Sequence, residues 1–256
     1  MTEKENWCAD FFDDLFAEHH LVRDDKKELD EAVAFLEEKL HLNPGDTVFD
    51  QCCGVGSLSI ALAEKGYHAH GIDLIPSYAA RAERDGAHGA DKCTFSAHDA
   101  YTYTTPAPCD AAANWWTSFG YSPDDAQNAL MLKRVYESLK DGAWFTLDYM
   151  NAPQRLKSFT NGDISFSEIK KPTCTIVWES YFDRAQNMIV KKWIYKGNDG
   201  KTVEKQGGGA KVYTQDDLSR LFADCGFTDI SFYGSTAGEP ANQDSPRCIV
   251  VARKKA

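Results

Sequence analysis

Two periodicities of hydrophobic positions follow one another along this chain. Apolar residues recur at helical spacing through residues 7–42, and the sequence Asn43-Pro44-Gly45-Asp46 ends that helical pattern. Short apolar runs typical of buried strands then alternate with stretches typical of helices. The strands are predicted over 47–53, 68–74, 93–99, 109–116 and 143–150, and the helices between them over 57–65, 76–88 and 124–140.

This alternation predicts βαβ units and therefore a parallel sheet with helices on its faces. The pattern changes over residues 163–213, where strand-like runs are separated by turn sequences such as Asn198-Asp199-Gly200. These runs predict an antiparallel insert, and the three glycines 207–209 within it are a candidate flexible hinge. After residue 213, a capped helix and two neighbouring antiparallel strands complete the chain.

Composition narrows the class of protein. The 256 residues are 43% hydrophobic and 26% charged, as in an ordinary globular protein. No run approaches the ~20 apolar residues of a membrane helix, and the acidic N-terminal sequence lacks the pattern of a secretory signal. We therefore expect a cytoplasmic protein that has no membrane partner.

Charge and cysteine content exclude two further classes. The net charge of −11 is the reverse of what a protein that neutralises phosphates needs, so we expect no nucleic-acid partner. The eight cysteines form no C-x-x-C pair and have no histidine cluster at zinc spacing, so we expect reduced thiols and no metal.

The segment Asp50-Gln51-Cys52-Cys53-Gly54-Val55-Gly56 lies where a predicted strand meets a predicted helix. Glycines at such a junction let the backbone approach a ligand closely. Asp73 ends the next strand, where a carboxylate can accept from both hydroxyls of a ribose. Asp99 and Ala100 end the third strand, where an acidic side chain can accept from an adenine amino group. The three strand ends together predict an adenosine site.

Two residues favour S-adenosylmethionine over a dinucleotide at this site. Ser59 occupies the third position of the dinucleotide fingerprint, where Gly or Ala is expected. Asp50 stands before the turn, where a carboxylate helps to hold an ammonium or sulfonium group and repels a pyrophosphate. A nicotinamide oxidoreductase is the alternative from a different class.

The run VFDQCCGVGSLSIALAEKGYHAHGIDL resembles the first two motifs of class I S-adenosylmethionine-dependent methyltransferases. The likeness continues through SAHDA, NWWTSFGYSPDD, VYESLKDGAWFTLDYMN and LFADCGFTDI, and so spans about residues 45–152 and 212–254. The helical N-terminal extension and the insert are similar to the small-molecule branch. The resemblance implies a Rossmann-like, doubly wound α/β fold: a mostly parallel seven-stranded sheet with an antiparallel β insert and N-terminal helices.

The resemblance also implies a single methyltransferase domain over residues 1–256. Its expected parts are a helical lid (1–44), a cofactor-binding core (45–152), the antiparallel insert (163–213), and a C-terminal helix and strands of the core (214–256).

Carried over by position, the resemblance implies which residues bind S-adenosylmethionine. They are Asp50, Cys52, Gly54, Gly56, Asp73, Leu74, Asp99, Ala100 and Asn114. Asn114 and Trp115 follow the fourth strand and are expected beside the reactive methyl as positioning residues. The family usually has glycine at Cys52 and an apolar residue at Gln51. Cys52 is small enough to be tolerated, whereas Gln51 has no assigned role.

Fewer signals describe the acceptor side. The expected substrate-binding residues are Trp7, Phe11, Tyr149, Asn151, Arg155 and Trp178. The aromatic stripe of Trp7, Phe11, Phe12 and Phe16 suits a core-facing helix and equally suits a lid that closes over the cofactor. His19, His20 and His98 are general-base candidates, with surface or structural roles as the alternative.

The resemblance implies methyl transfer to a nitrogen or oxygen of a small-molecule acceptor, by a monomer or homodimer. The leaving group is already activated, so the protein has to supply mainly alignment and desolvation. Two alternatives stay open: non-methyl chemistry of the same cofactor, such as aminocarboxypropyl transfer or cyclisation, and a non-catalytic binding protein.

Overall fold

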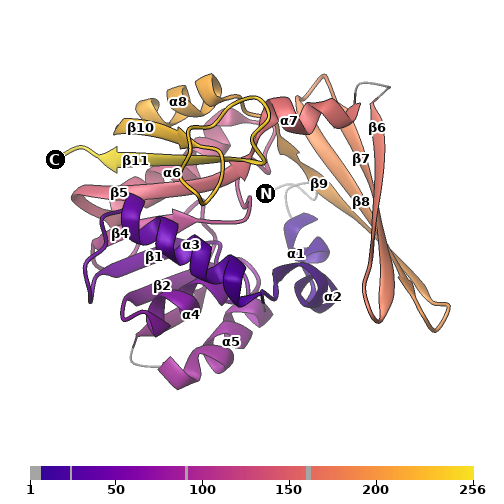
Figure 1. Ribbon diagram of the computed structural model, residues 1–256, viewed down its shortest axis with the longest axis horizontal. Helices are drawn as coiled ribbons and strands as arrows, with labels where there is room; N and C mark the ends of the chain where they lie inside the picture. Colours follow the sequence, from indigo (N-terminus) through magenta and orange to yellow (C-terminus); the bar gives the residue numbers. More distant parts are fainter. Residues whose placement is uncertain (1–6, 24, 90–91, 160–162) are drawn as a thin grey trace.

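Two β-sheets organise the computed structural model, which describes residues 7–23, 25–89, 92–159 and 163–256 (Figure 1). The larger sheet has the strand order β10-β11-β5-β4-β1-β2-β3. Its strands are β1 (Thr47–Gln51), β2 (His68–Asp73), β3 (Cys93–Ala97), β4 (Cys109–Asn114), β5 (Leu139–Met150), β10 (Phe227–Tyr233) and β11 (Arg247–Lys254). Strands β1 to β5 pair in parallel, and β11 is antiparallel to both of its neighbours. The predicted fold class is confirmed.

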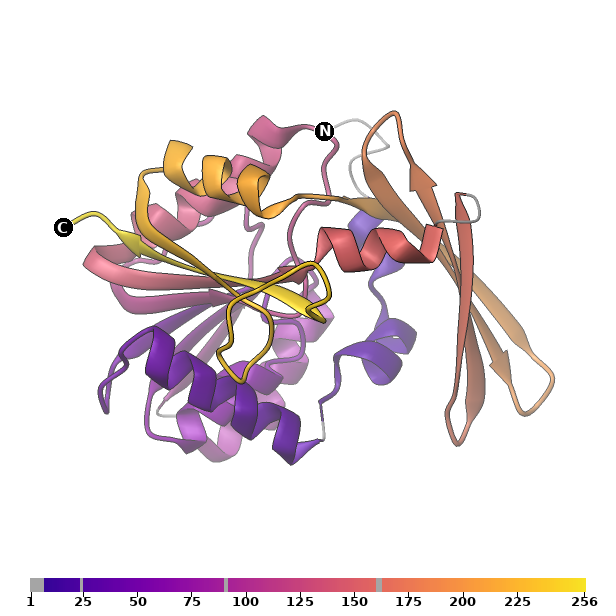
Figure 2. The same ribbon diagram turned by 45° about the horizontal axis from the view of Figure 1, so that its top comes forward.

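Helices cover both faces of this large sheet (Figures 1 and 2). They are α3 (Lys26–Lys39), α4 (Ser57–Glu64), α5 (Pro76–Asp85), α6 (Asp125–Ser138) and α8 (Gln215–Asp224), with a 3-10 turn at Gly86–Gly89. On β1, Phe49 packs with residues of α6 and α8, whereas the adjacent Val48 packs with residues of α3 and α4. Because both faces are buried, the strands are nearly continuous apolar runs in the sequence.

The smaller sheet is the predicted antiparallel insert. Its strands are β6 (Ile164–Lys170), β7 (Cys174–Asp183), β8 (Met188–Gly197) and β9 (Thr202–Lys211), in the order β6-β7-β8-β9. Helix α7 (Ala152–Leu156) and the turn Lys157–Phe159 connect it to β5. The backbone nitrogen of Lys211 donates to the carbonyl of Gly120 over 2.7 Å, which ties the small sheet to the loop after β4.

The N-terminal segment lies between the two sheets (Figures 1 and 2). It consists of α1 (Trp7–Phe11), α2 (Asp14–Phe16) and a π-helical turn (Ala17–Leu21), so the helical pattern predicted over 7–42 is broken into pieces. Asp13 accepts from the nitrogen of Phe16 and begins α2, and Asp25 accepts from two nitrogens of the first turn and begins α3. Aspartate side chains at these positions compete with a continuous helix. Residues 1–6 of the expected lid lie outside the described residues.

The glycine triplet expected as a hinge lies inside β9, so that prediction is wrong. A Cβ atom on Gly207 would lie 3.1 Å from ring atoms of Trp7 and Phe11, and one on Gly208 would overlap the Trp7 ring. The glycines therefore allow α1 to pack against the face of the strand.

Most predicted boundaries shift by a few residues, and for two of them the backbone shows why. The fourth strand was expected to reach residue 116, but it ends at Asn114 because Trp116 and Thr117 have φ of 59° and 63°. Their nitrogens donate to the Asp148 side chain and carbonyl, each over 3.0 Å, which turns the chain toward β5. Helix α6 ends at Ser138, two residues early, because Leu139 already pairs with Cys109 in the sheet.

A buried polar network below the sheet edge accounts for Gln51. Its side chain is 0% exposed. Its Nε2 donates to the carbonyls of Met131 (3.1 Å) and Ala100 (3.5 Å), and its Oε1 accepts from Nδ2 of Asn114 (3.1 Å). An apolar side chain could not make these bonds, and Gln51 thereby joins β1, β4 and α6.

We expect Gln51→Ala to lower the free energy of unfolding by about 2–4 kcal/mol, because it leaves an amide and two carbonyls buried without partners. Denaturant titration would measure the change. The exposed Gln186→Ala provides the control, with an expected change below about 0.5 kcal/mol. Equal stabilities of the two variants would show that water replaces the network.

Candidate active site

A cavity of about 1140 Å³ lies between the carboxyl ends of β1 to β3 and the small sheet. This volume exceeds the ~300–1,000 Å³ typical of a site for a single ligand. Six of the residues predicted to bind the cofactor line it: Cys52, Gly54, Asp73, Leu74, Asp99 and Ala100. The predicted strand ends therefore meet at one wall of one cavity.

Asp73 fixes the geometry of that wall. Its carboxylate accepts from the backbone nitrogens of Gly54 and Ile75, both over 2.9 Å. Burial raises the pKa of Asp73 to about 6, although these hydrogen bonds oppose the rise. Gly54 has a φ of 56°, so the turn points its N–H at the carboxylate. The side chain is held in place and still lines the cavity.

Asp99 lies on the same wall, where its Oδ1 accepts from the nitrogen of Tyr101 over 2.8 Å. Helix α1 places Cys8 close to both carboxylates. Burial raises the pKa of the Cys8 thiol to about 12, and the charges of Asp73 and Asp99 add to the rise. The N-terminal segment is thus adjacent to the strand-end carboxylates.

Known proteins share the sequence of the central domain and the fold of the whole chain. Residues 48–142 match the methyltransferase domain family. The fold is similar to that of an S-adenosylmethionine-dependent methyltransferase from Clostridium acetobutylicum, with a TM-score of 0.76 and 17% identity over 94% of this chain and 97% of that one. It is also similar to an amino pentose methyltransferase of calicheamicin biosynthesis from Micromonospora echinaspora, solved with bound S-adenosylmethionine: TM-score 0.70, 17% identity, 95% and 98% coverage.

The chain therefore contains a methyltransferase domain, and its fold is that of S-adenosylmethionine-dependent methyltransferases.

A partial sequence relative is a 23S rRNA uracil C5-methyltransferase from Polynucleobacter necessarius. It is 32% identical over 78 residues, which are 30% of this chain and 16% of that protein. The match therefore spans about a sixth of that relative's length.

The cavity wall of the methyltransferase suits S-adenosylmethionine as its cofactor. Two carboxylates at neighbouring strand ends can accept from the ribose hydroxyls and the adenine amino group. Cys52 has a φ of 65°, a left-handed conformation that costs most residues about 1–2 kcal/mol and explains why glycine is usual there. Its side chain lines the cavity without blocking the turn.

Three predicted cofactor residues do not reach the cavity lining: Asp50 and Gly56 of the turn, and Asn114. Asp50 is 2% exposed and accepts from Oγ of Ser59 over 2.7 Å. Burial raises its pKa to about 7. Gly56 has a φ of 83°, and a Cβ there would lie 2.7 Å from Ala82. Both residues shape the turn from inside, and Ser59 replaces the fingerprint glycine because it bonds to Asp50.

The structure places the two predicted positioning residues, Asn114 and Trp115, in the core. Asn114 is 0% exposed and donates to Gln51, and Trp115 is 5% exposed and packs against Phe35. Neither lines the cavity, whereas Trp116 and Thr117 do. The left-handed turn at residues 116 and 117 directs these next side chains into the cavity and leaves Trp115 in the core.

Five of the six predicted substrate residues line the cavity: Trp7, Phe11, Asn151, Arg155 and Trp178. The sixth, Tyr149, does not, because it is fully buried and its hydroxyl donates to the carbonyl of Lys211. Asn151 lines the cavity but uses its amide hydrogens on the carbonyls of Asn242 (2.9 Å) and Ser245 (2.7 Å).

The predicted histidines separate into two groups. His19 and His20 line the cavity, and Nε2 of His20 lies 3.0 Å from the hydroxyl of Tyr195. Burial lowers the pKa of His20 to about 4, so it is uncharged at neutral pH. His98 lies outside the cavity lining and stacks on Tyr103.

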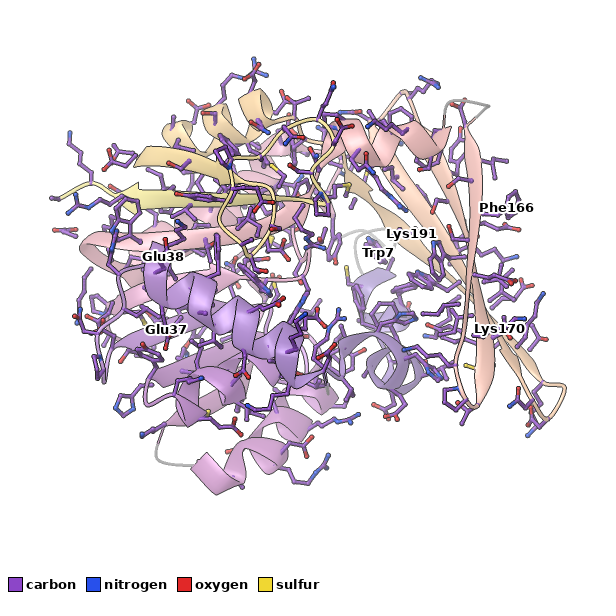
Figure 3. All side chains as sticks on the ribbon, viewed as in Figure 1. Trp7, Glu37, Glu38, Phe166, Lys170 and Lys191 are labelled. Carbon is purple, nitrogen blue, oxygen red and sulfur yellow. The ribbon has the colours of Figure 1, made fainter. Side chains whose placement is uncertain are left out.

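Sequence reasoning named only Arg155 among the cations of the cavity wall and missed the others, including Lys191 and Arg247. Arg247 forms an ion pair with the buried Asp148 and also donates to the hydroxyl of Thr117 over 3.1 Å. Lys191 could have been found from the period-two pattern of its strand, because Trp193 lies two residues further on the same face. In Figure 3, Lys191 extends from the small sheet toward the large one.

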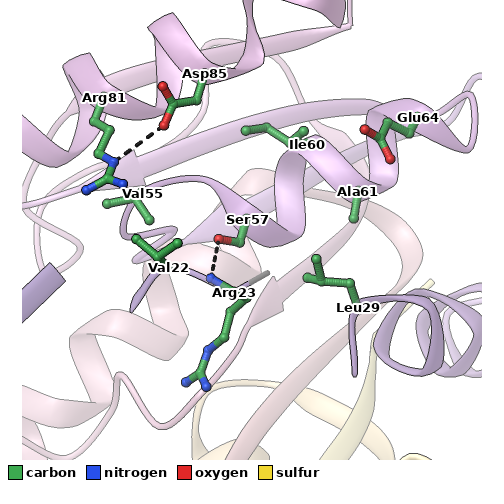
Figure 4. Close-up of a pocket in the computed structure, with 10 residues that line it drawn as sticks. All are labelled: Val22, Arg23, Leu29, Val55, Ser57, Ile60, Ala61, Glu64, Arg81 and Asp85. Carbon is green, nitrogen blue, oxygen red and sulfur yellow. Dashed lines mark hydrogen bonds and ion pairs between the residues drawn. The ribbon is translucent and has the colours of Figure 1, made fainter. Parts of the chain in front are cut away.

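A smaller hollow of about 210 Å³ lies outside this site, along α4 and α5 (Figure 4). Two polar contacts lie along it: the backbone nitrogen of Arg23 approaches Oγ of Ser57 at 3.4 Å, and Arg81 pairs with Asp85. Within the described ranges, no trio of His, Cys, Asp or Glu is placed to hold a metal ion. Nor is any helix there long and apolar enough to cross a bilayer.

We expect Asp73→Ala to weaken S-adenosylmethionine binding by about 2–4 kcal/mol, because two charge-assisted hydrogen bonds are lost. Ribose hydroxyls donate to the ionised carboxylate, so the affinity should fall as the pH drops through about 6 and level off above it. Calorimetry across pH 5 to 8 measures both effects.

Asp85→Ala, on the outer surface of α5, is the control and should bind the cofactor normally. Asp73→Asn should lose the pH step. An unchanged affinity in Asp73→Ala would remove this residue from the cofactor site.

Proposed function

We propose that this methyltransferase transfers the methyl group of S-adenosylmethionine to a nitrogen or oxygen of a small-molecule acceptor. The cavity carries the proposal. It extends from the strand-end carboxylates to the inner face of the small sheet, so a cofactor and a second, small molecule fit within one enclosure. The amino pentose methyltransferase with the same fold acts on an acceptor of such a size.

The proposed roles follow the positions of the side chains. Asp73 accepts from the ribose hydroxyls, and Asp99 accepts from the adenine amino group, with Leu74 and Ala100 beside the adenine. Cys52 and Gly54 lie at the methionine end. Trp7, Phe11, Arg155 and Trp178 form the acceptor walls, all of them cavity-lining residues.

The bound cofactor supplies a methyl group on a sulfonium, which is already an activated leaving group. The acceptor's lone pair forms the new bond to the methyl carbon while the carbon–sulfur bond breaks and its electron pair stays on sulfur. The acceptor's proton then passes to a base or to water. His20 contacts the Tyr195 hydroxyl in the cavity, but its lowered pKa makes it a weak proton acceptor, so we propose water as the destination of the proton. The aromatic walls exclude water and align the acceptor.

A small acceptor is favoured over RNA by two observations. The net charge of −11 opposes a phosphate backbone. Aromatic side chains of the N-terminal segment also line the cavity, and this segment lies between the two sheets, which narrows the space for a large polymer. A cytoplasmic location and a monomeric or homodimeric state remain predictions from the sequence.

The test is transfer of an isotopically labelled methyl group from S-adenosylmethionine. The enzyme is incubated in parallel with a metabolite extract and with total RNA, and products are identified by mass spectrometry. We expect a labelled small molecule that is absent without enzyme. Label in RNA alone would overturn the proposal, and a cofactor-derived product other than methyl would show different chemistry.

We also propose that the N-terminal segment acts as a lid over the cofactor. Trp7 contacts Tyr121 with a ring-centroid distance of 5.4 Å and packs on the glycines of β9. Nζ of Lys205 pairs with Asp13 over 2.7 Å. These contacts join the segment to the small sheet and the loop after β4, while its helices have only five, three and five residues. Such short elements depend on tertiary contacts for stability.

The lid should exchange its amide hydrogens rapidly in the free enzyme and slowly with S-adenosylhomocysteine bound. We expect Trp7→Ala to keep residues 7–16 in fast exchange and to lower kcat while the melting temperature changes little. Glu18→Ala, an exposed change in the same segment, is the control. Slow exchange in the free enzyme that is unaltered by ligand would show a purely structural segment.

A further inference from the structure

The cavity wall contains more basic side chains than acidic ones. Among the described residues that line it, the acidic ones are Asp73 and Asp99, both at the cofactor wall. The basic ones are Arg23, Arg155, Lys157, Lys171, Lys191 and Arg247. A chain with a net charge of −11 therefore has a cavity wall where cations outnumber acids.

Three of these cations have acidic partners: Arg247 pairs with Asp148, Lys157 with Asp244, and Arg23 with Glu28. Their charges are compensated within the protein. Among the described residues, no carboxylate pairs with Arg155, Lys171 or Lys191; of these three, Lys171 is exposed, whereas Arg155 and Lys191 are partly buried.

Ser180 is a neighbour of both Arg155 and Lys191. The guanidinium of Arg155 donates to Oγ of the buried Ser180 over 3.4 Å. Ser180 on β7 is the register partner of Lys191 on β8, and paired residues of antiparallel strands present their side chains on the same face. The next pair on that face is Trp178 and Trp193.

The two cations raise the electrostatic free energy of the empty cavity. Burial, together with the charges of Arg155 and Arg247, lowers the pKa of Lys191 to about 8. Nζ of Lys191 has an aromatic neighbour, the Trp193 ring, at 5.6 Å. An anion between the ammonium and the guanidinium would compensate both charges and accept hydrogen bonds from both.

We propose that the acceptor carries an anionic group, a carboxylate or a phosphate, that binds between Lys191 and Arg155. This inference rests on the proposed function, since it names the chemical class of the acceptor. The tryptophan pair beside Lys191 then contacts the neighbouring part of the acceptor, and the anion sets its position relative to the methyl group.

The test divides a metabolite extract by anion exchange into an anionic and a non-anionic half and offers each half to the enzyme with methyl-labelled S-adenosylmethionine. We expect labelled product from the anionic half. Lys191→Met should lower kcat/KM for that acceptor about 100-fold, mainly through KM, because a buried charge partner is removed. Arg155→Gln should act in the same direction, and neither variant should change cofactor affinity.

Lys192→Met is the matched control. Lys192 is the next residue of β8, faces the other side of the sheet and pairs with Glu204 over 2.7 Å. The Lys192→Met change removes one positive charge from β8, as Lys191→Met does. It should leave kcat/KM within about two-fold of the wild type. Label only from the non-anionic half, or equal kcat/KM in the Lys191→Met and Lys192→Met variants, would overturn the proposal.

A binding measurement separates this proposal from the proposed function. Inorganic phosphate and acetate are titrated separately into the enzyme saturated with S-adenosylhomocysteine, with tryptophan fluorescence as the readout. Saturable binding of either anion that is lost in Lys191→Met supports the anion site even if no extract yields methylated product, and the stronger anion indicates the acceptor group. Absence of saturable binding of both anions would overturn it.

Discussion

The hydrogen bonds from Gly54 and Ile75 to the carboxylate of Asp73 hold the end of β2 against the turn after β1, and the cofactor wall depends on them. The turn reaches the carboxylate only because Cys52 and Gly54 adopt positive φ. A buried charge that accepts two backbone N–H bonds is oriented before a ligand arrives, so little ordering remains to be done on binding. The same burial raises the pKa of Asp73, which makes the wall sensitive to mild acid.

The rest of the cavity depends on close packing of the Trp7 ring against the backbone of β9, which is distant in the sequence. The Trp7 ring fits against β9 because Gly207 and Gly208 have no Cβ there. This contact brings together α1, the small sheet and, through Tyr121, the loop after β4. The wall is therefore built from three segments that the large sheet alone would leave apart. Charged side chains on the wall of such a cavity are partly removed from water, which strengthens their interactions.

The sequence predicts the features of this site that depend on local patterns, and it does not predict those that depend on contacts between distant residues. The strands, their order of appearance and the acids at their ends were predictable, because apolar periodicity is local and the carboxyl ends of parallel strands meet at one edge. The left-handed turn at Trp116 has no local signal, so Trp115 was placed in the site and Trp116 was not. The glycines of β9 resembled a hinge because their partner, Trp7, lies two hundred residues earlier.

The net charge of −11 describes the surface of the protein, but it does not predict the excess of basic side chains on the cavity wall. Along β8 the side chains alternate, so Lys191 faces the cavity and Lys192 faces the other side, where it pairs with Glu204. Salt screens exposed charges over a Debye length of ~8 Å at physiological ionic strength, whereas a buried cation is screened much less. The exterior acids therefore do not cancel the field of Lys191 and Arg155. An acidic protein can in this way oppose phosphate backbones at its surface and still favour one anionic group in its interior.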